Sequence, residues 1–147
     1  MSSLIDNTDR AILACLEQDA RMSLKTLSSR IGLTSPSTAE RLRRLEEKGI
    51  IQGYSARINI AELGYSLQVL VRVRPLPGML KKVEKYLQGL STCIECDKVT
   101  GEDCFVARLV LRDIAHLDTE LDQLAEIAQC NTSIIKSSPV TRRLPAL

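Results

Sequence analysis

Two short helices joined by a tight glycine turn are the feature that most constrains how this chain can fold. Ser23 can cap the first helix, whose apolar residues recur on one side: Leu24, Leu27 and Ile31. Gly32 can end that helix, because glycine adopts a positive φ without steric cost. Only residues 32–34 precede the next helix, which starts at Ser35 and ends before Gly49. This spacing predicts a helix-turn-helix.

The second helix, residues 35–48 and called the reader helix below, has two unlike sides. Leu42 and Leu45 can pack inward, whereas hydroxyls gather at its start and cations recur along the opposite side. Small side chains let a helix end approach base edges, and cations meet phosphates. We therefore predict a set of DNA-binding residues: Ser35, Ser37, Thr38, Arg41, Arg44 and Lys48. The alternative is a solvated surface helix, since three glutamates nearly cancel the cations: Glu40, Glu46 and Glu47.

Arg41 and Arg44 lie one helical turn apart and therefore share a face. A good bidentate contact with a base contributes about 1–3 kcal/mol of discrimination. The alternative for these cations is pairing within the helix, as between Glu40 and Arg44 or between Arg43 and Glu47. We assign Arg41 and Arg44 to DNA and Arg43 to intrahelical pairing.

Further elements complete a DNA-binding domain over residues 1–53. Asp6 or Asn7 can cap a preceding helix that packs behind the pair. Residues 50–54 look like a short extended segment, in the place that a wing would occupy. The pattern therefore predicts a winged helix-turn-helix, followed by a linker over residues 54–65.

Residues 66–147 follow the order strand, helix, strand, strand, helix, strand. Alternating and helical apolar patterns place the six elements at 67–73, 79–90, 93–100, 104–111, 114–128 and 131–138. A tight turn at residues 101–103 joins the second and third strands. This βαββαβ order is the ferredoxin-like arrangement, so the whole chain is expected to have an α+β fold.

The first and third strands carry apolar residues on both faces. Leu70 opposes its neighbours on the first strand, and Val106 and Val110 do so on the third. Helices can cover only one face of a ferredoxin-like sheet, and strands that are buried on both sides need cover on both. We expect the second cover to be another copy of the same sheet, and hence a dimer.

With both halves described, the chain resembles the Lrp/AsnC (feast-famine) family over nearly its whole length. The resemblance rests on the order and spacing of five segments: IDNTDRAIL at 5–13, LSSRIGL at 27–33, ERLRRLE at 40–46, GIIQGY at 49–54 and VTG at 99–101. It implies a transcription regulator in which the winged helix-turn-helix is joined to a ligand-sensing domain. Such domains dimerise, often build octamers, and commonly respond to amino acids.

The resemblance also implies an effector site between dimers, near the turn after the second strand. Candidate effector residues are then Thr100, Gly101, Glu102 and Asp103 in the turn, with Thr132 and Ser133 on the last strand. Each of the last two hydroxyls could equally be an ordinary sheet residue. The family often has an aspartate where this chain has Cys104, which leaves open which acid meets the ammonium group of an amino acid.

Composition and cysteine usage limit the other functions. A net charge of +2 is too small for binding polyanions by bulk charge, so contacts with double-stranded DNA must come from local placement. Five cysteines and no apolar leader predict reduced thiols in a cytoplasmic protein that does not enter the membrane. Cys93 and Cys96 would face opposite sides of a strand, and His116 stands alone, so neither a metal nor a cofactor is expected.

Three rival functions remain. Siroheme decarboxylases resemble the same family, but this chain has one histidine and an intact cationic stripe, so we expect no enzyme activity. RNA-recognition motifs share the βαββαβ order but need exposed aromatic residues, of which the sheet has only Phe105. A sensor that acts only through protein partners would bind no DNA at all.

Overall fold

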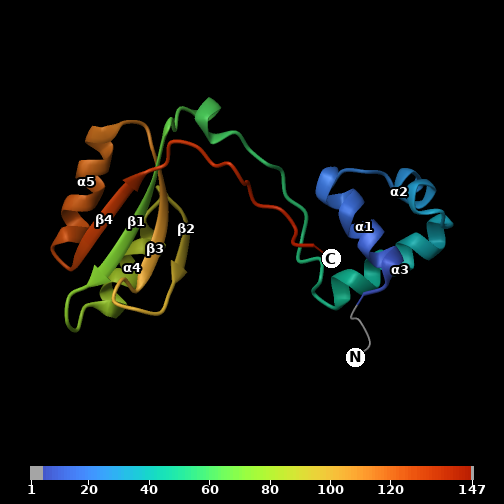
Figure 1. Cartoon of the computed structure of the whole chain (residues 1–147), viewed down its shortest axis with the longest axis horizontal. Helices are drawn as coiled ribbons and strands as arrows, with labels where there is room; N and C mark the ends of the chain where they lie inside the picture. Colours follow the sequence, from blue (N-terminus) through green and yellow to red (C-terminus); the bar gives the residue numbers. More distant parts are fainter. Residues whose placement is uncertain (1–4, 147) are drawn as a thin grey trace. The chain divides into compact units, whose positions relative to one another are not determined.

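A computed structural model describes residues 5–146, and the chain divides into two compact units. Residues 5–57 together with 140–146 form the first, called the reader unit, and residues 58–139 form the second, called the sensor unit (Figure 1). The break after Arg57 falls inside the linker expected at 54–65. The last residues, which the sequence pattern places in the sensing domain, group with the reader unit.

The reader unit contains three helices: α1 (Asn7–Gln18), α2 (Leu24–Ile31) and α3 (Ser35–Glu47). Its buried apolar core takes one main residue from each, namely Ile12, Leu27 and Leu45. Partly buried side chains such as Leu42 and Ile50 surround them. The predicted helix-turn-helix is therefore α2 and α3, with α1 packed against both.

Side chains and glycines set the helix ends where the sequence places them. Asp6 caps α1, because its Oδ1 accepts from the Asp9 N–H at 2.8 Å while Asp9 Oδ2 accepts from the Asp6 N–H at 3.3 Å. Ser23 caps α2 and Thr34 caps α3. Gly32 has φ of 71°, so the three-residue turn uses the left-handed conformation that glycine favours.

No wing strand forms, because residues 51–59 are irregular and no strand precedes β1 within residues 5–146. The extended segment predicted at 50–54 was therefore not a strand. A two-stranded wing needs a second strand to pair with, and the chain instead runs on into the short 3-10 helix Ile60–Leu63.

The sensor unit has the predicted βαββαβ order: β1 (Leu67–Pro75), α4 (Leu80–Gly89), β2 (Cys93–Lys98), β3 (Phe105–Leu111), α5 (Ile114–Ala125) and β4 (Ala128–Ile134). The four strands form an antiparallel sheet in the order β2-β3-β1-β4. This confirms the ferredoxin-like α+β fold.

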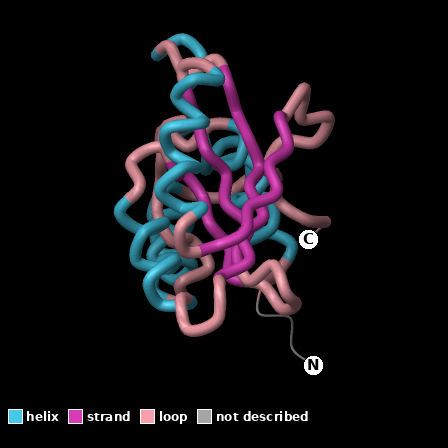
Figure 2. Tube along the Cα trace, turned by 90° about the vertical axis from the view of Figure 1, so that its left-hand side faces the viewer, coloured by secondary structure: helices cyan, strands magenta, loops and turns pink. Residues whose placement is uncertain are grey.

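Both sensor helices cover the same face of the sheet (Figure 2). Val69, Val71 and Val73 alternate onto that face from β1 and pack against Val83 of α4 and Leu124 of α5. The opposite face, called the open face, carries the residues between them. Pairing in register places these open-face residues side by side: Gln68, Leu70 and Arg72 on β1 with Val110, Arg108 and Val106 on β3. Alternation along β1 places Arg74 on the same face.

The open face is partly apolar, as the two-sided pattern predicts. Leu70 and Val106 are half-buried and Val110 is buried within the chain itself. Polar groups flank them, since Arg108 pairs with Glu95 at 3.5 Å. The apolar surface that a second copy could cover is therefore narrower than the sequence alone suggests.

The end of the chain differs from the prediction. Helix α5 stops at Ala125 and β4 spans Ala128–Ile134, so the strand starts three residues earlier than expected and does not include Ser137. Ile127 and Ala128 are buried and continue the helical apolar stripe, which concealed the boundary. The pairing of Ala128 with Pro75 of β1 fixes the start of β4.

The prediction that Cys93 and Cys96 face opposite sides of β2 was wrong. A bulge between Cys93 and Glu95 shifts the register, so Cys93 pairs with Leu109 and Cys96 with Ala107. Both partners lie on the helix-covered face, and both cysteines therefore face it too. Burial raises the pKa of both thiols, which keeps them protonated rather than reactive.

Candidate functional site

The start of the reader helix is packed more tightly than its small side chains suggest. Thr38 is fully buried, and its hydroxyl donates to the Thr34 carbonyl at 2.9 Å. The Ser35 hydroxyl lies 3.2 Å from that of Ser28 on α2. Ser37 is exposed. In this conformation Thr38 supports the turn and presents no surface to a ligand, whereas Ser37 does.

Arg41 turns back into the protein instead of standing out from the helix. Its Nη1 lies 2.7 Å from Asp6 Oδ2 and 2.8 Å from Asp9 Oδ1, the two carboxylates that cap α1. The side chain of Asp9 is only 6% exposed. These contacts raise the pKa of Arg41, while the Asp9 N–H and then Arg41 lower the pKa of Asp6. Arg41 thus links α3 to α1.

The remaining charges of α3 sort into paired and unpaired groups. Arg43 pairs with Glu40 at 2.6 Å and with Glu47, as the intrahelical assignment predicts. Arg44 and Lys48 are exposed and form no ion pair with any residue from 5 to 146. They are therefore the cations of α3 that are available to an anionic partner.

Glu46, another of the three glutamates of the reader helix, is bonded to Tyr54. The Tyr54 hydroxyl donates to Glu46 Oε1 at 2.8 Å, and burial, followed by this carboxylate, raises the pKa of Tyr54 to about 12. The glutamates that seemed to cancel the cationic stripe thus have partners of their own. Charge pairing along the surface of the helix therefore accounts for Arg43, whereas Arg41 pairs with α1.

The predicted effector turn lies between β2 and β3, over residues 99–104. The Val99 N–H donates to the Cys104 carbonyl at 2.8 Å and closes the turn, and Gly101 has φ of 107°. The Cys104 thiol donates to the carbonyl oxygens of Gly101 and Glu102. The turn is thus a preformed hairpin end that leaves the Glu102 side chain in solvent.

Arg74 of β1 lies beside this turn, although the sequence pattern did not single it out. Its Nη2 lies 2.8 Å from Glu102 Oε2 and its Nε lies 3.3 Å from Asp103 Oδ1. Alternation along β1 places Arg74 on the open face together with Arg72 and does not distinguish between them. Only the pairing of β1 with β3 brings Arg74 beside the turn.

The other two predicted effector residues lie elsewhere. Thr132 and Ser133 sit on β4, which is separated from the strands of the turn by β1. Adjacent residues of a strand point to opposite faces, and here Thr132 pairs with Val71 and Ser133 with Leu70. Within one chain, neither shares a site with the turn.

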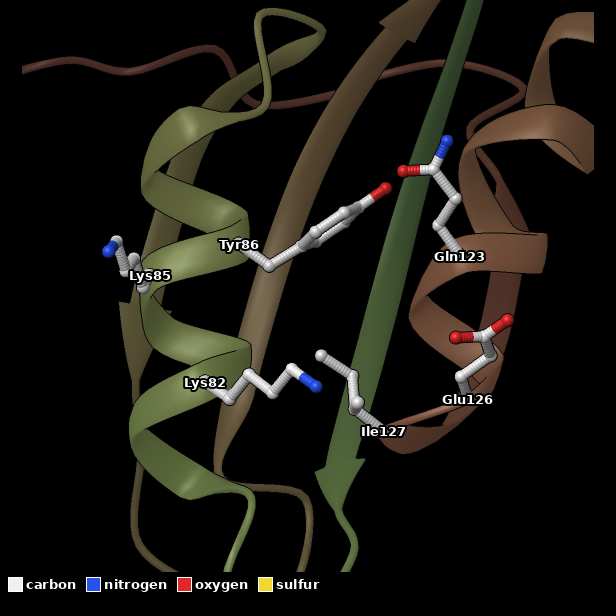
Figure 3. A pocket seen from close by; sticks show the side chains of 6 residues that line it. All are labelled: Lys82, Lys85, Tyr86, Gln123, Glu126 and Ile127. Carbon is white, nitrogen blue, oxygen red and sulfur yellow. The ribbon is translucent and has the colours of Figure 1, made fainter.

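A shallow cleft also lies between α4 and α5 (Figure 3). Tyr86 points across it toward Gln123, and its hydroxyl donates to the Glu120 carbonyl at 3.1 Å. Lys85 points away from the cleft. The Tyr86 hydroxyl is therefore already bonded, while Lys82, Gln123 and Glu126 also line the cleft.

Comparison with known proteins decides the family. The model of a winged helix-turn-helix DNA-binding domain matches residues 5–52, and that of the Lrp/AsnC ligand binding domain matches residues 68–145. The chain belongs to the Lrp/AsnC family. The HTH-type transcriptional regulator LrpA of Mycobacterium tuberculosis is 32% identical over 133 residues, covering 90% of this chain and 89% of that protein. The leucine-responsive regulatory protein of Escherichia coli is 36% identical over 114 residues, covering 76% and 70%.

Solved structures of Lrp/AsnC proteins share the fold. Bacillus subtilis LrpC has a TM-score of 0.89 at 26% identity, covering 95% of this chain and 100% of that one. A feast or famine regulatory protein of M. tuberculosis complexed with L-methionine has a TM-score of 0.86 at 29% identity, covering 95% and 97%. Like its relatives, the chain is a transcriptional regulator with a DNA-binding and a ligand-binding domain.

Residues 5–146 lack the features of a membrane span and of a metal site. No helix there is long and apolar enough to cross a membrane. No group of three or more histidine, cysteine, aspartate or glutamate side chains there is placed to hold a metal ion.

We predict that Arg41→Ala destabilises the reader unit, because the Asp9 carboxylate would stay buried without its cation. The expected loss is about 1–3 kcal/mol of the free energy of unfolding, measured by urea denaturation of the full chain. Arg44→Ala is the matched control and should change stability by no more than about 0.5 kcal/mol. Adding Asp9→Asn to Arg41→Ala should recover part of the loss, and equal stability of Arg41→Ala and wild type would contradict the role of the link.

Proposed function

We propose that this Lrp/AsnC regulator binds operator DNA as a dimer through α3 and that a free amino acid modulates the binding. The observation that carries the DNA part is the exposed, unpaired pair Arg44 and Lys48 on the second helix of a helix-turn-helix. Ser37 at the exposed start of α3 is the proposed close contact, with Ser35 beside it. Arg41 and Thr38 hold the helix in place.

The dimer follows from the modest charge of one reader. Two unpaired cations on α3 provide only weak binding by one reader. When two readers are linked, binding of the first raises the effective concentration of the second at its half-site, and the overall affinity rises. The half-buried residues Leu70 and Val106 of the open face support a second sheet as the partner. A two-fold dimer then requires a roughly palindromic operator with half-sites spaced by about whole helical turns.

Relatives support an amino acid as the effector. One is named for its response to leucine, and another was solved with L-methionine. In this chain the turn at 99–104 supplies polar backbone groups and two carboxylates, and Arg74 of β1 brings a guanidinium to both carboxylates. An effector that binds one assembly better than another shifts the spacing of the readers, and so the affinity for DNA.

A regulator is preferred over the enzyme alternative. The relatives are named as transcriptional regulators, and the cations of α3 that a DNA reader needs are exposed. Binding of a tetrapyrrole by purified protein that ignores DNA would reverse this preference.

We predict that Arg44→Ala weakens operator binding without unfolding the protein, because Arg44 is exposed and forms no ion pair with any residue from 5 to 146. A lost base contact would cost about 1–3 kcal/mol per reader, and a lost phosphate contact would instead lower the salt slope by about 1. Fluorescence anisotropy at several salt concentrations separates the two. Arg43→Ala is the control, since Arg43 is paired within the helix. An unchanged Arg44→Ala isotherm would exclude the contact.

Leu70→Asp tests the dimer. A carboxylate in the centre of the open face must be desolvated when a second sheet covers it, so we expect monomers by sedimentation equilibrium and much weaker DNA binding. Ile114→Asp, at an exposed position on α5, is the control and should leave the assembly intact. A dimer of Leu70→Asp as tight as that of the wild type would place the interface elsewhere.

The effector is tested by titrating DNA from upstream of the gene with full-length protein in the presence of each of the common amino acids in turn. At least one should change the apparent affinity by about 5–150-fold, the usual range of allosteric coupling. A specific complex that none of them alters would remove the effector from the proposal, and the lack of any specific complex would remove the DNA part.

A further inference from the structure

The last described residues of the chain form an irregular segment on the reader unit. Residues 140–146, called the arm below, follow the sensor unit in sequence but group with residues 5–57 by their contacts (Figure 1). They form neither helix nor strand. Other DNA-binding domains use an irregular terminal arm beside the helix that enters the groove.

Packing of apolar side chains does not explain why the arm lies on the reader unit. Every residue of the arm is exposed, and the apolar side chains of Val140 and Leu144 belong to residues that are 64% and 40% exposed. Within residues 5–146, the apolar core of the reader unit contains no residue of the arm. The arm therefore adds little to the stability of the reader unit, and its side chains remain available to a partner.

The charged side chains of the arm are all cationic. It carries Arg142 and Arg143 and no aspartate or glutamate. Both arginines are exposed, and neither forms an ion pair with any residue from 5 to 146. Their charges are therefore available to an anionic partner, as are those of Arg44 and Lys48 on α3.

The arm also sets much of the charge difference between the two units. Residues 1–57 carry nine lysines and arginines against seven aspartates and glutamates, a net side-chain charge of +2. The two arginines of the arm raise this charge to +4, whereas residues 58–139 carry nine against eleven, or −2. Half of the net positive charge of the reader unit therefore lies in the arm.

The phosphate backbone of double-stranded DNA is the partner that fits these observations. A guanidinium binds phosphate through two parallel hydrogen bonds, and an irregular segment can adjust two neighbouring arginines to successive phosphates. No wing strand is present within residues 5–146 to supply backbone contacts beside α3. The arm is a segment of the same unit that can supply them.

We propose that the arm binds the DNA backbone beside the half-site that α3 contacts, with Arg142 and Arg143 each binding a phosphate. This assignment rests on the proposed function, because it requires that α3 binds DNA. Phosphate contacts carry no sequence information, so the arm raises the affinity for operator and for unrelated DNA alike.

The test measures how the affinity depends on salt. Full-length wild type and the double variant Arg142→Gln/Arg143→Gln are titrated by fluorescence anisotropy against DNA from upstream of the gene and against a scrambled duplex, at about 50–200 mM salt. Each lost phosphate contact lowers the slope of log K against log salt by about 0.9, so the variant should lose about 2 for each bound protomer. The ratio of the two affinities should not change.

Two further variants serve as controls. Lys136→Gln removes an exposed cation of the sensor unit shortly before the arm and should keep the slope of the wild type. Arg142→Lys/Arg143→Lys keeps both charges and should keep most of the slope. Urea denaturation and sedimentation equilibrium check that each variant folds and assembles as the wild type does.

The outcomes separate the arm from the proposed function. If the double glutamine variant keeps the slope of a wild type that binds DNA, the arm does not bind the backbone, and the proposed function stands. Weaker binding with an unchanged slope, or a change of assembly, would make the role of the arm structural and overturn the assignment. A changed ratio of the two affinities would overturn it as well, because the arm would then act on sequence recognition. If the wild type binds neither duplex, both the assignment and the DNA part of the proposed function are overturned.

Discussion

The small core of the reader unit is the constraint on which its other features depend. Ile12, Leu27 and Leu45 are its buried apolar centre, and no aromatic side chain adds area to them. A core of this size leaves the orientation of α3 weakly determined by packing alone. Polar contacts therefore also help to orient α3, and one of them links Arg41 to the capping carboxylates of α1, of which Asp9 is buried.

This use of Arg41 has a consequence for DNA recognition. In this conformation the charge of Arg41 is matched by Asp6 and Asp9, and Arg43 is likewise paired along the helix. The reader helix is left with a small free charge, which fits the low net charge of the chain. In the function proposed above, joining two readers in a dimer adds affinity, so the spacing of the readers in the dimer would control DNA binding.

In the sensor unit, the central strands β1 and β3 fix the position of the turn at 99–104, as the capping contacts fix the position of the reader helix. Their pairing buries one face against α4 and α5 and carries the open-face side chains to fixed positions. Arg74 reaches the turn because β1 pairs with β3, the strand that follows the turn. The turn itself is closed by backbone and thiol hydrogen bonds, which leaves its two carboxylates available for charge pairing.

The sequence by itself determined the elements and their order, because helix caps, the glycine turn and apolar periodicity are local properties. Asp6, Ser23 and Gly32 act where the pattern places them, and the βαββαβ order is confirmed. Only the tertiary structure decided which charges are free and which faces residues occupy. Arg41 and Arg44 are alike on a helical wheel, yet one meets a buried carboxylate of another helix and the other meets solvent. The bulge that turns Cys93 and Cys96 to one face, the early start of β4 and the position of Arg74 have the same origin. Each depends on strand register or on a contact between segments far apart in the chain, and no local pattern records such contacts.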